Sequence, residues 1–275
     1  VRTIISFENS FHGRTLGALA ATGQTKYQQG FGPLPEGFDY VPYNDLEALE
    51  NRLGSDVCGV LLEPLQGEGG VIPAEPGFLA GVRDLCDRYD ALMMVDEIQT
   101  GMGRTGEYFA HQHDGVKPDL IALAKGLAGG FPMGALLVRE SVRGAFKPGD
   151  HASTFGGNPF VATMACTVME VLEEEELLSN ARERGQQIRE GMSQLADQFD
   201  PVRSPRGRGL MLGLPLEEDL VATEIMHELR NQGLIVGTAG NNALRLVPPL
   251  VLTETEAGEL LQRLEELRLE ELPRR

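Results

Sequence analysis

The sequence predicts an α/β protein built around a mostly parallel sheet, followed by a smaller α+β domain. Strand and helix patterns alternate over the first two thirds of the chain, which is typical of βαβ units. The strands are continuous apolar runs such as "ALMMVDE" (91–97), as buried parallel strands are. Near residue 200 this alternation gives way to shorter strands and helices. We therefore expect a large domain over 1–199 and a small domain over 200–275.

In the large domain, apolar patterning places the individual elements. Strands are expected at 58–64, 91–97, 119–126 and 134–140. Apolar residues recur at helical spacing in 76–90 and again in 158–199, which predicts a helix over each range. The "EEEE" run inside the second helix is expected to form a solvated face.

The small domain is predicted from the same signals together with helix caps. Strands are expected at 207–216, 234–238 and 242–250. The helix over 219–233 is expected to stop at Gly233, because glycine favours the position that follows a helix. The last helix, 253–272, begins with Thr253 and Glu256 at the spacing of a capping box.

Composition restricts the class of protein. The net charge is -17, from 41 acidic and 24 basic residues, which argues against nucleic acid or an anionic membrane as a partner. No apolar run reaches the roughly 18 residues that suggest a membrane helix, and no signal peptide is recognised. Cys58, Cys86 and Cys166 are odd in number and lack metal spacing. They are typical of the reducing cytoplasm, where we expect this protein.

Two charged residues are expected at the ends of buried strands. Lys125, one of only four lysines, follows the apolar residues 120–124 within "DLIALAKG". Asp96 ends another predicted strand 29 residues earlier (125 − 96 = 29). Carboxyl ends of parallel strands meet at the ligand crevice. A desolvated lysine attacks carbonyls, and a lysine paired with an aspartate is typical of pyridoxal phosphate (PLP) sites. Alternatively, Lys125 is only solvated and Asp96 caps a helix or pairs with an arginine. The two residues alone leave both interpretations open.

Two further segments favour a cofactor. "STFGGNP" (153–159) places a hydroxyl and two glycines before a helix, which suits a phosphate, although ordinary capped loops look similar. "SFHGRT" (10–15) offers an aromatic ring for stacking, although a lone phenylalanine is usually core. His111 and His113 lack a third metal ligand and are interpreted as surface residues. The glycines of 66–70 match neither a P-loop nor a Rossmann turn.

Five segments together carry a resemblance to a known family. "LLEPLQGEGG", "VDEIQTGMGRTG", "LIALAKGLAGGFPMGA", "STFGGNP" and "LRLVPPL" resemble the class III (ornithine-type) PLP-dependent aminotransferases, in that family's order and over nearly the whole chain. "FHGRTLGALAATG" is most similar to the acetylornithine aminotransferases within it. The resemblance implies the fold type I architecture of PLP enzymes. It also implies transfer of the terminal amino group of N-acetylornithine to 2-oxoglutarate, a step of arginine biosynthesis.

The resemblance also implies roles for the residues around the cofactor ring. Lys125 would bind PLP covalently and move the proton of the substrate. Asp96 would bind the pyridinium nitrogen, and Gln99 would approach the phenolic oxygen. Phe11 and Ile98 would lie against the two faces of the ring.

Four other residues are implied to bind phosphate or substrate. Thr154 would bind the phosphate of the neighbouring subunit, which implies a homodimer with shared sites. Arg245 would hold the α-carboxylate of glutamate or 2-oxoglutarate as a bidentate fork. Glu63 would neutralise Arg245 while the amino donor is bound. Arg14 would hold a carboxylate of the acetylated donor.

Several alternatives remain at this point. Ornithine, 4-aminobutyrate, succinylornithine or a carrier-linked lysine would serve as donor in other members of the family. Family members carry an upstream Gly-Ser/Thr-rich turn that binds the phosphate, whereas this sequence starts at Val1 within a strand-like "TIISF". We therefore expect an N-terminally truncated chain that binds PLP weakly, and an inactive fragment is a further alternative. An NAD-dependent dehydrogenase would need a G-x-G-x-x-G turn after the first strand, and none is present.

Overall fold

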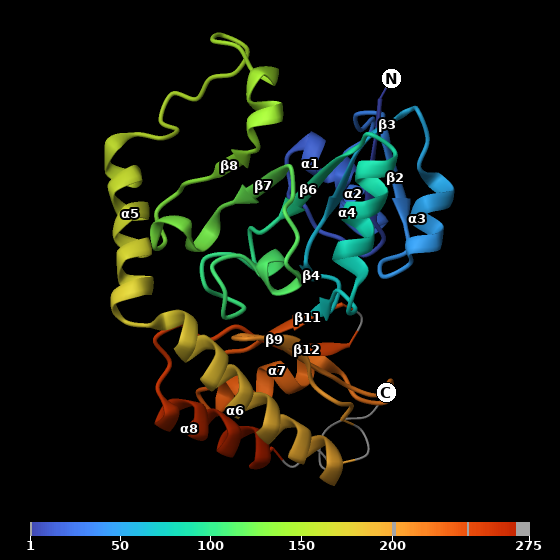
Figure 1. Ribbon diagram of the computed structural model, residues 1–275. Coiled ribbons are helices and arrows are strands. Elements are labelled where there is room, and N and C mark those ends of the chain that lie inside the picture. The colour runs from blue at the N-terminus through green and yellow to red at the C-terminus, as the bar shows by residue number, and fades with distance from the viewer. Residues whose placement is uncertain (1, 200–201, 241, 268–275) are drawn as a thin grey trace.

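The computed structural model describes residues 2–199, 202–240 and 242–267, and contains two main sheets (Figure 1). The larger sheet has six strands in the order β2-β1-β3-β6-β7-β8. Their bounds are Phe38–Val41, Thr3–Phe7, Val57–Leu62, Leu92–Asp96, Leu120–Leu123 and Ala135–Val138 in that order. All neighbouring pairs are parallel except β7 and β8. This confirms the predicted mostly parallel α/β fold.

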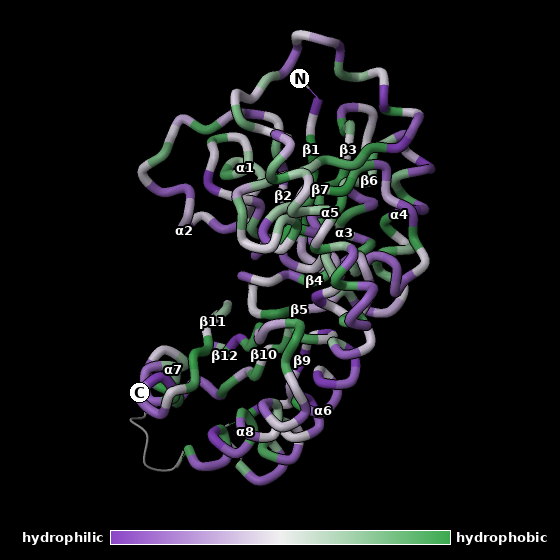
Figure 2. Tube along the Cα trace, turned by 90° about the vertical axis from the view of Figure 1, so that its left-hand side faces the viewer, coloured by the Kyte–Doolittle hydropathy of each residue, from purple (hydrophilic) through white to green (hydrophobic). Residues whose placement is uncertain are grey.

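The core of the large domain lies between this sheet and two helices, α3 (Leu46–Arg52) and α4 (Phe78–Arg88). The helix α4 presents Leu79 and Val82 to the strands, as the helical spacing predicts. Burying each such side chain contributes about 1.5–3 kcal/mol. Figure 2 shows this apolar character along the central strands of the sheet. Two short helices, α1 (Leu16–Ala21) and α2 (Thr25–Gln28), follow β1.

The second sheet is antiparallel, in the order β11-β12-β10-β9. Its strands are Gly237–Ala239, Ala243–Leu246, Met211–Pro215 and Arg206–Arg208 in that order. Helices α6 (Leu177–Gln198), α7 (Ala222–Asn231) and α8 (Glu254–Glu265) share its core (Figure 1). That core includes Ala181 and Ile188, which precede the expected boundary at residue 199. The division of the chain into 1–199 and 200–275 stays a prediction.

The single helix expected over 158–199 is two helices, α5 (Pro159–Glu174) and α6. Glu176 adopts the left-handed conformation at the break, with φ of 53°. Acidic residues are unfavourable at a helix C-terminus, where the helix dipole is negative, and the glutamate run lies there. Leu172 of α5 packs in the large domain, whereas Ile188 of α6 packs on the second sheet. Leu177 at the start of α6 still packs with α5, and the rest of α6 packs on the second sheet.

The strand expected over 207–216 is also wrong in detail, because it is the hairpin of β9 and β10. Arg208 pairs with Met211, so the turn contains only Gly209 and Leu210. Gly209 has a φ of 53°, which glycine adopts without strain. The predicted end of α7 and the predicted start of α8 are confirmed. Gly233 follows α7 with a φ of 83°, and the Thr253–Glu256 capping box of α8 is present.

Short elements complete the described chain: β4 (Leu65–Gln66), β5 (Ile72–Pro73), and the 3-10 helices η1 (Ala110–Asp114), η2 (Lys125–Ala128) and η3 (Glu140–Ala145). Within the described ranges, no helix combines the length and apolar character that crossing a bilayer requires. Residues 268–272 of the expected last helix lie outside the described residues.

One arginine joins the two domains. The Arg104 Nη1 atom donates hydrogen bonds to the carbonyl oxygens of Leu210, at 3.0 Å, and Pro248, at 2.5 Å. Burial lowers the pKa of Arg104 to about 10. Among the described residues, no carboxylate forms an ion pair with this guanidinium. Its role is to donate hydrogen bonds to backbone carbonyl oxygens of the small domain. Sequence reasoning did not predict it.

Candidate active site

The predicted site residues follow the carboxyl ends of four neighbouring parallel strands. Phe11 comes after β1, Glu63 directly after β3, Asp96 ends β6, and Lys125 follows β7. Asp96 pairs in register with Ala122, three residues before Lys125. Because these strand ends meet at one edge of the sheet, Phe11, Glu63, Asp96 and Lys125 lie together there, as expected for an open α/β sheet. We call these four residues the strand-end cluster.

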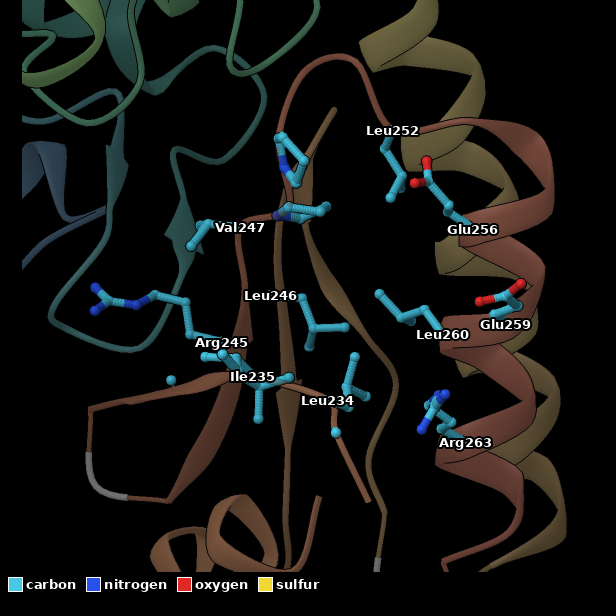
Figure 3. A pocket seen from close by; sticks show the side chains of 15 residues that line it. Leu234, Ile235, Arg245, Leu246, Val247, Leu252, Glu256, Glu259, Leu260 and Arg263 are labelled. Atoms are coloured by element: carbon cyan, nitrogen blue, oxygen red, sulfur yellow. The ribbon is translucent and has the colours of Figure 1, made fainter. Parts of the chain in front are cut away.

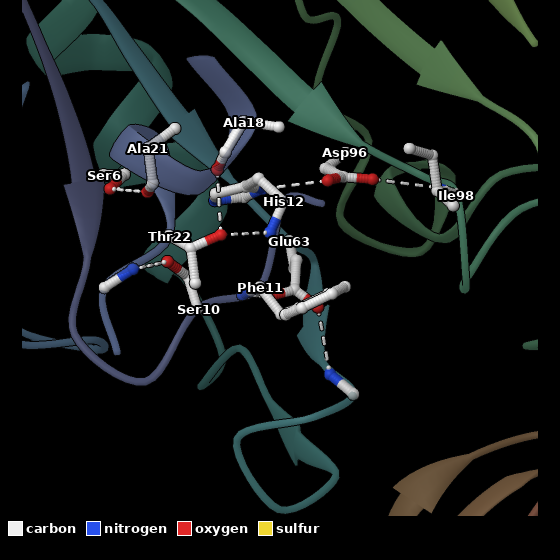
Figure 4. Close-up of polar contacts among 12 residues, drawn as sticks. Ser6, Ser10, Phe11, His12, Ala18, Ala21, Thr22, Glu63, Asp96 and Ile98 are labelled. Atoms are coloured by element: carbon white, nitrogen blue, oxygen red, sulfur yellow. Dashed lines mark hydrogen bonds and ion pairs between the residues drawn. The ribbon is translucent and has the colours of Figure 1, made fainter. Parts of the chain in front are cut away.

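Asp96 is a buried carboxylate with two protein donors (Figure 4). Its Oδ2 atom lies 2.8 Å from His12 Nδ1, and its Oδ1 atom accepts a hydrogen bond of 3.0 Å from the amide of Ile98. With an ionised Asp96, which only accepts, the proton of this contact belongs to His12 Nδ1. The other ring nitrogen, Nε2, is buried without a partner among the described residues. Sequence reasoning missed His12, whose only signal was its place beside Phe11.

Lys125 lies in a conformation that non-glycine residues rarely adopt. Its φ is 48°, in the left-handed region, and such outliers cluster at functional sites. The residue is more exposed than the sequence suggested, because it begins η2 beyond the end of β7. Partial burial nevertheless lowers the pKa of Lys125, and the carboxylates of Glu68, Asp96 and Glu63 act in the opposite direction. Lys125 therefore shares one electrostatic environment with these three acids.

Arg245 pairs with Glu68 and not with Glu63. The Arg245 Nη1 atom lies 2.6 Å from Glu68 Oε1, and the charge of Arg245 also acts on Lys125. The expected Glu63–Arg245 pair is therefore wrong. Glu63 is buried and is the first residue after β3 in sequence. Glu68 lies in the loop after β4, and this loop contacts the small domain. There the carbonyl of Glu68 accepts a hydrogen bond of 2.9 Å from the amide of Gly240.

The remaining predicted residues are placed as follows. Phe11 is half-buried, with its ring 5.4 Å from that of Tyr27, and the Arg14 guanidinium carbon lies 4.5 Å from the Tyr27 ring centre. Gln99 lies close against Gly67, because a Cβ added there would be 2.8 Å from the Gln99 Oε1 atom. Thr154 is exposed in the loop before α5 and has no described contact with the strand-end cluster.

Glu97 forms a buried network that sequence reasoning also missed. Its carboxylate accepts hydrogen bonds from the amides of Ala110, at 3.0 Å, and His111, at 2.9 Å, and from the hydroxyl of Thr100. The His111 Nδ1 atom lies 2.9 Å from the same carboxylate. His111 is therefore buried, and its interpretation as a surface residue was wrong. The network fixes the segment that follows Asp96.

Replacing Glu97 by alanine should destabilise the fold by about 3–5 kcal/mol, because it leaves buried donors without an acceptor. Urea unfolding measures this free energy. Glu50→Ala is a suitable control, because Glu50 forms only an exposed ion pair with Arg88, expected to contribute less than about 1 kcal/mol. Equal losses in the two variants would contradict the assigned role of Glu97.

The titration of Glu63 should make stability depend on pH. Burial raises the pKa of Glu63 to about 7, and the Asp96 charge adds to this, while His12 acts against it. Between about pH 4.5 and 7 the folded chain then holds a proton that the unfolded chain has lost. The free energy of unfolding therefore falls as pH rises through this window, by up to about 3 kcal/mol from this group. Urea unfolding from pH 5 to 8 should show a smaller fall for Glu63→Gln than for the parent, and equal slopes would contradict the assignment.

A pocket of about 550 Å³ lies in the small domain (Figure 3). It is lined by 233–237, 245–249 and part of α8. Figure 3 shows the Arg245 side chain extending away from α8, toward the large domain. Lys125 and Asp96 do not line this pocket. The candidate catalytic residues therefore lie in the strand-end cluster and not in this pocket. Arg245 lines the pocket, and its charge also acts on Lys125 of the cluster.

Comparison with known proteins identifies the family. The family model for class-III aminotransferases matches residues 2–267. The chain belongs to the class-III aminotransferase family. An acetylornithine aminotransferase from Caldanaerobacter subterraneus is 48% identical over 265 residues, covering 96% of this chain and 67% of the relative.

Solved structures agree with this assignment to class III. An ornithine aminotransferase from Toxoplasma gondii, crystallised with partial occupancy of PLP at its active site, has a TM-score of 0.93 at 34% identity, covering 96% of this chain and 64% of that one. The N-acetylornithine aminotransferase from Stenotrophomonas maltophilia has a TM-score of 0.79 at 40% identity, covering 96% and 65%. This chain spans about two thirds of the length of such relatives.

The strand-end cluster fits the chemistry of PLP, the cofactor named for the Toxoplasma relative. Lys125 offers an amine with a lowered pKa for the aldehyde carbon, and Asp96 keeps free lone pairs for a ring nitrogen. Phe11 offers an aromatic face and Gln99 a carboxamide. The His12 Nε2 atom is buried without a hydrogen-bond partner among the described residues. The side chains present at these strand ends therefore fit a PLP group by their own chemistry.

Proposed function

We propose that this chain forms the greater part of a PLP-dependent transaminase. The reaction transfers the terminal amino group of N-acetylornithine to 2-oxoglutarate. The observation that carries the proposal is the strained Lys125 backbone beyond β7, in one electrostatic environment with Asp96 and the Arg245–Glu68 pair. The choice of donor rests on 48% identity to an acetylornithine aminotransferase.

The residues of the chain would divide the work around the cofactor. Bound PLP supplies an electron sink for the carbon that carries the amino group. Asp96 would accept a hydrogen bond from the ring nitrogen and hold its proton there, with His12 fixing the carboxylate. Lys125 would bind the cofactor and move the substrate proton through Nζ. Phe11 and Ile98 would enclose the ring, and Gln99 would approach its phenolic oxygen.

Arg245 would recognise the dicarboxylate substrate. It is paired with Glu68 at 2.6 Å, so its charge is neutralised when no second carboxylate is present. A carboxylate of 2-oxoglutarate or glutamate would displace Glu68 and bind the guanidinium through two parallel hydrogen bonds. Arg14, held against the Tyr27 ring, would contact the carboxylate of the amino donor.

Arg245→Lys should raise the KM for 2-oxoglutarate about tenfold or more, because lysine keeps the charge but loses the planar fork. Steady-state kinetics with both substrates varied measures this change. Arg203→Lys is the control, since Arg203 is exposed and pairs with Glu217 on the surface. An unchanged KM in Arg245→Lys would count against carboxylate recognition by Arg245.

A donor panel tests the proposed function directly. Each of N-acetylornithine, ornithine, 4-aminobutyrate and succinylornithine is supplied with 2-oxoglutarate, and glutamate formation is followed. The proposal predicts the highest kcat/KM for N-acetylornithine. A higher value for another donor would reassign the substrate, and no glutamate from any donor would contradict the transaminase proposal.

A homodimer and a cytoplasmic location are further parts of the proposal. Large apolar side chains are exposed in the loop before β8, on β8 itself, in the segment that follows it and on α5: Phe131, Leu136, Leu137, Val138, Phe146, Phe155, Phe160 and Met169. A second copy covering this face would bring Thr154, which lies within it, to the partner's cofactor phosphate. The three free cysteines support a reducing compartment.

Sedimentation velocity tests the homodimer. We expect a dimer for the parent chain and a monomer for Leu137→Lys, because a charge on the apolar face opposes its burial. A monomeric parent at micromolar concentration, or a dimeric Leu137→Lys, would contradict this interface.

A further inference from the structure

Glu63 is a buried carboxylate that the proposed reaction leaves unused. It is 4% exposed and follows β3 directly. Its two oxygens serve two different segments, because Oε1 accepts a hydrogen bond of 2.9 Å from the Phe11 amide and Oε2 one of 3.1 Å from the Gly67 amide. Figure 4 shows Glu63 beside Phe11, with dashed lines marking the hydrogen bonds of its carboxylate. One carboxylate therefore connects two backbone amides that are 67 − 11 = 56 residues apart in sequence.

The two connected segments carry opposite ends of the candidate site. Phe11 precedes His12, which contacts Asp96 at 2.8 Å and so belongs to the ring-binding end. Gly67 precedes Glu68, which holds Arg245 at the carboxylate-binding end. A Cβ at Gly67 would be 2.8 Å from the Gln99 Oε1 atom, so this loop also lies close to the turn that follows β6.

We propose that Glu63 is a positioning residue that ties the Phe11 segment to the loop bearing Glu68. The tie keeps the ring-binding face and Arg245 at a fixed separation while the Arg245–Glu68 pair opens for a dicarboxylate. This role rests on the proposed transaminase function. It differs from direct neutralisation of Arg245, because the Glu63 oxygens bond to backbone amides and act through Phe11 and Gly67.

The chemistry of the tie requires an ionised carboxylate. Both oxygens then accept, and hydrogen bonds to a charged acceptor are the stronger kind. A glutamine offers one acceptor and one donor, so it can satisfy only one of the two amides. Protonation has a similar effect, since it turns one oxygen into a hydroxyl donor.

The surroundings of Glu63 set the pH at which the tie weakens. His12 faces it from the segment after β1, and Asp96 from the last position of β6. Lys125 faces it from the segment after β7, and Tyr43 from the segment after β2. Burial raises the pKa of Glu63, so the tie is expected to be complete above neutral pH and partly lost below it. Binding of 2-oxoglutarate should therefore weaken as the solution is acidified.

Amide hydrogen exchange, resolved by residue on the full chain, tests the tie without turnover. In Glu63→Gln, exchange of at least one of the Phe11 and Gly67 amides should accelerate about tenfold or more, because a bond is lost. Glu97→Gln is the matched control, since Glu97 is an equally buried acceptor for Ala110 and His111 amides. It should leave Phe11 and Gly67 unchanged. Unaltered protection in Glu63→Gln, or equal acceleration in both variants, would overturn the proposal.

A second variant guards against misfolding. Glu63→Asp keeps the charge but is one methylene shorter, so it should also lose one of the two bonds. If Glu63→Gln does not fold, the exchange comparison is made with Glu63→Asp and the same two outcomes decide it.

A kinetic measurement separates positioning from simple stabilisation. Glu63→Gln should raise the KM for 2-oxoglutarate about tenfold and remove its dependence on pH between 6 and 8, since the titrating group is gone. A loss of folded protein alone would lower the apparent kcat and leave KM and its pH profile as in the parent, which would contradict the positioning role. A parent chain without transaminase activity would contradict the proposed function, and amide exchange would then decide the tie alone.

Discussion

Lys125→Ala should abolish transamination. The substitution removes the amine that would hold the cofactor and move the substrate proton. The proton-transfer step alone contributes about 10²–10⁴-fold. Lys125 is exposed, and its side chain makes no hydrogen bond or ion pair among the described residues, so the fold should persist. Steady-state glutamate formation and circular dichroism measure the two effects separately.

Lys117→Ala is the matched control for this experiment. Lys117 lies shortly before β7, at the opposite end of the strand from Lys125, and is exposed. Its removal should change neither activity nor fold. A Lys125→Ala enzyme with a rate within a few-fold of the parent would refute the assignment of Lys125.

Asp96→Asn should lower kcat by about 10- to 100-fold. The isosteric amide removes the negative charge that would hold a proton on the ring nitrogen. Losing a hydrogen bond to a charged group costs about 1.5–3 kcal/mol. The amide also disturbs the His12 contact at 2.8 Å, which adds to the loss. Single-turnover kinetics with the amino donor measures the first half of the reaction and so isolates this effect.

Asp119→Asn provides the comparison for Asp96. Asp119 is also a buried carboxylate, but it binds Arg83 and Arg139 and lies just before β7, away from Lys125. Its substitution should reduce stability and leave the rate per folded molecule unchanged. If Asp96→Asn and Asp119→Asn lowered that rate equally, Asp96 would have no special part in the reaction.

Much of the fold could be predicted from local patterns. The apolar runs of β3 and β6 and the caps at Gly233 and Thr253 depend on neighbouring residues alone, and they were found. The break between α5 and α6 was missed, because it arises from two separate cores that one helical pattern does not reveal. The turn at Gly209 was missed for a related reason, since the apolar residues continue through it.

The candidate site was predictable where a residue ends a strand. Asp96 and Lys125 lie at strand ends, and the parallel order of β6 and β7 brings them together. The partner of Arg245 was not predictable in this way. Glu63 and Glu68 both follow β3 closely in sequence, and only the path of the glycine-rich loop decides which one reaches the small domain. The acid within "QGEGG" was the available signal.

Covalent trapping of PLP tests the central assignment most directly. The purified chain is mixed with PLP and reduced with borohydride, and the labelled peptide is located by mass spectrometry. We expect one label per chain, at Lys125. Labelling spread over Lys26, Lys117 and Lys147, or no stable label at all, would contradict it.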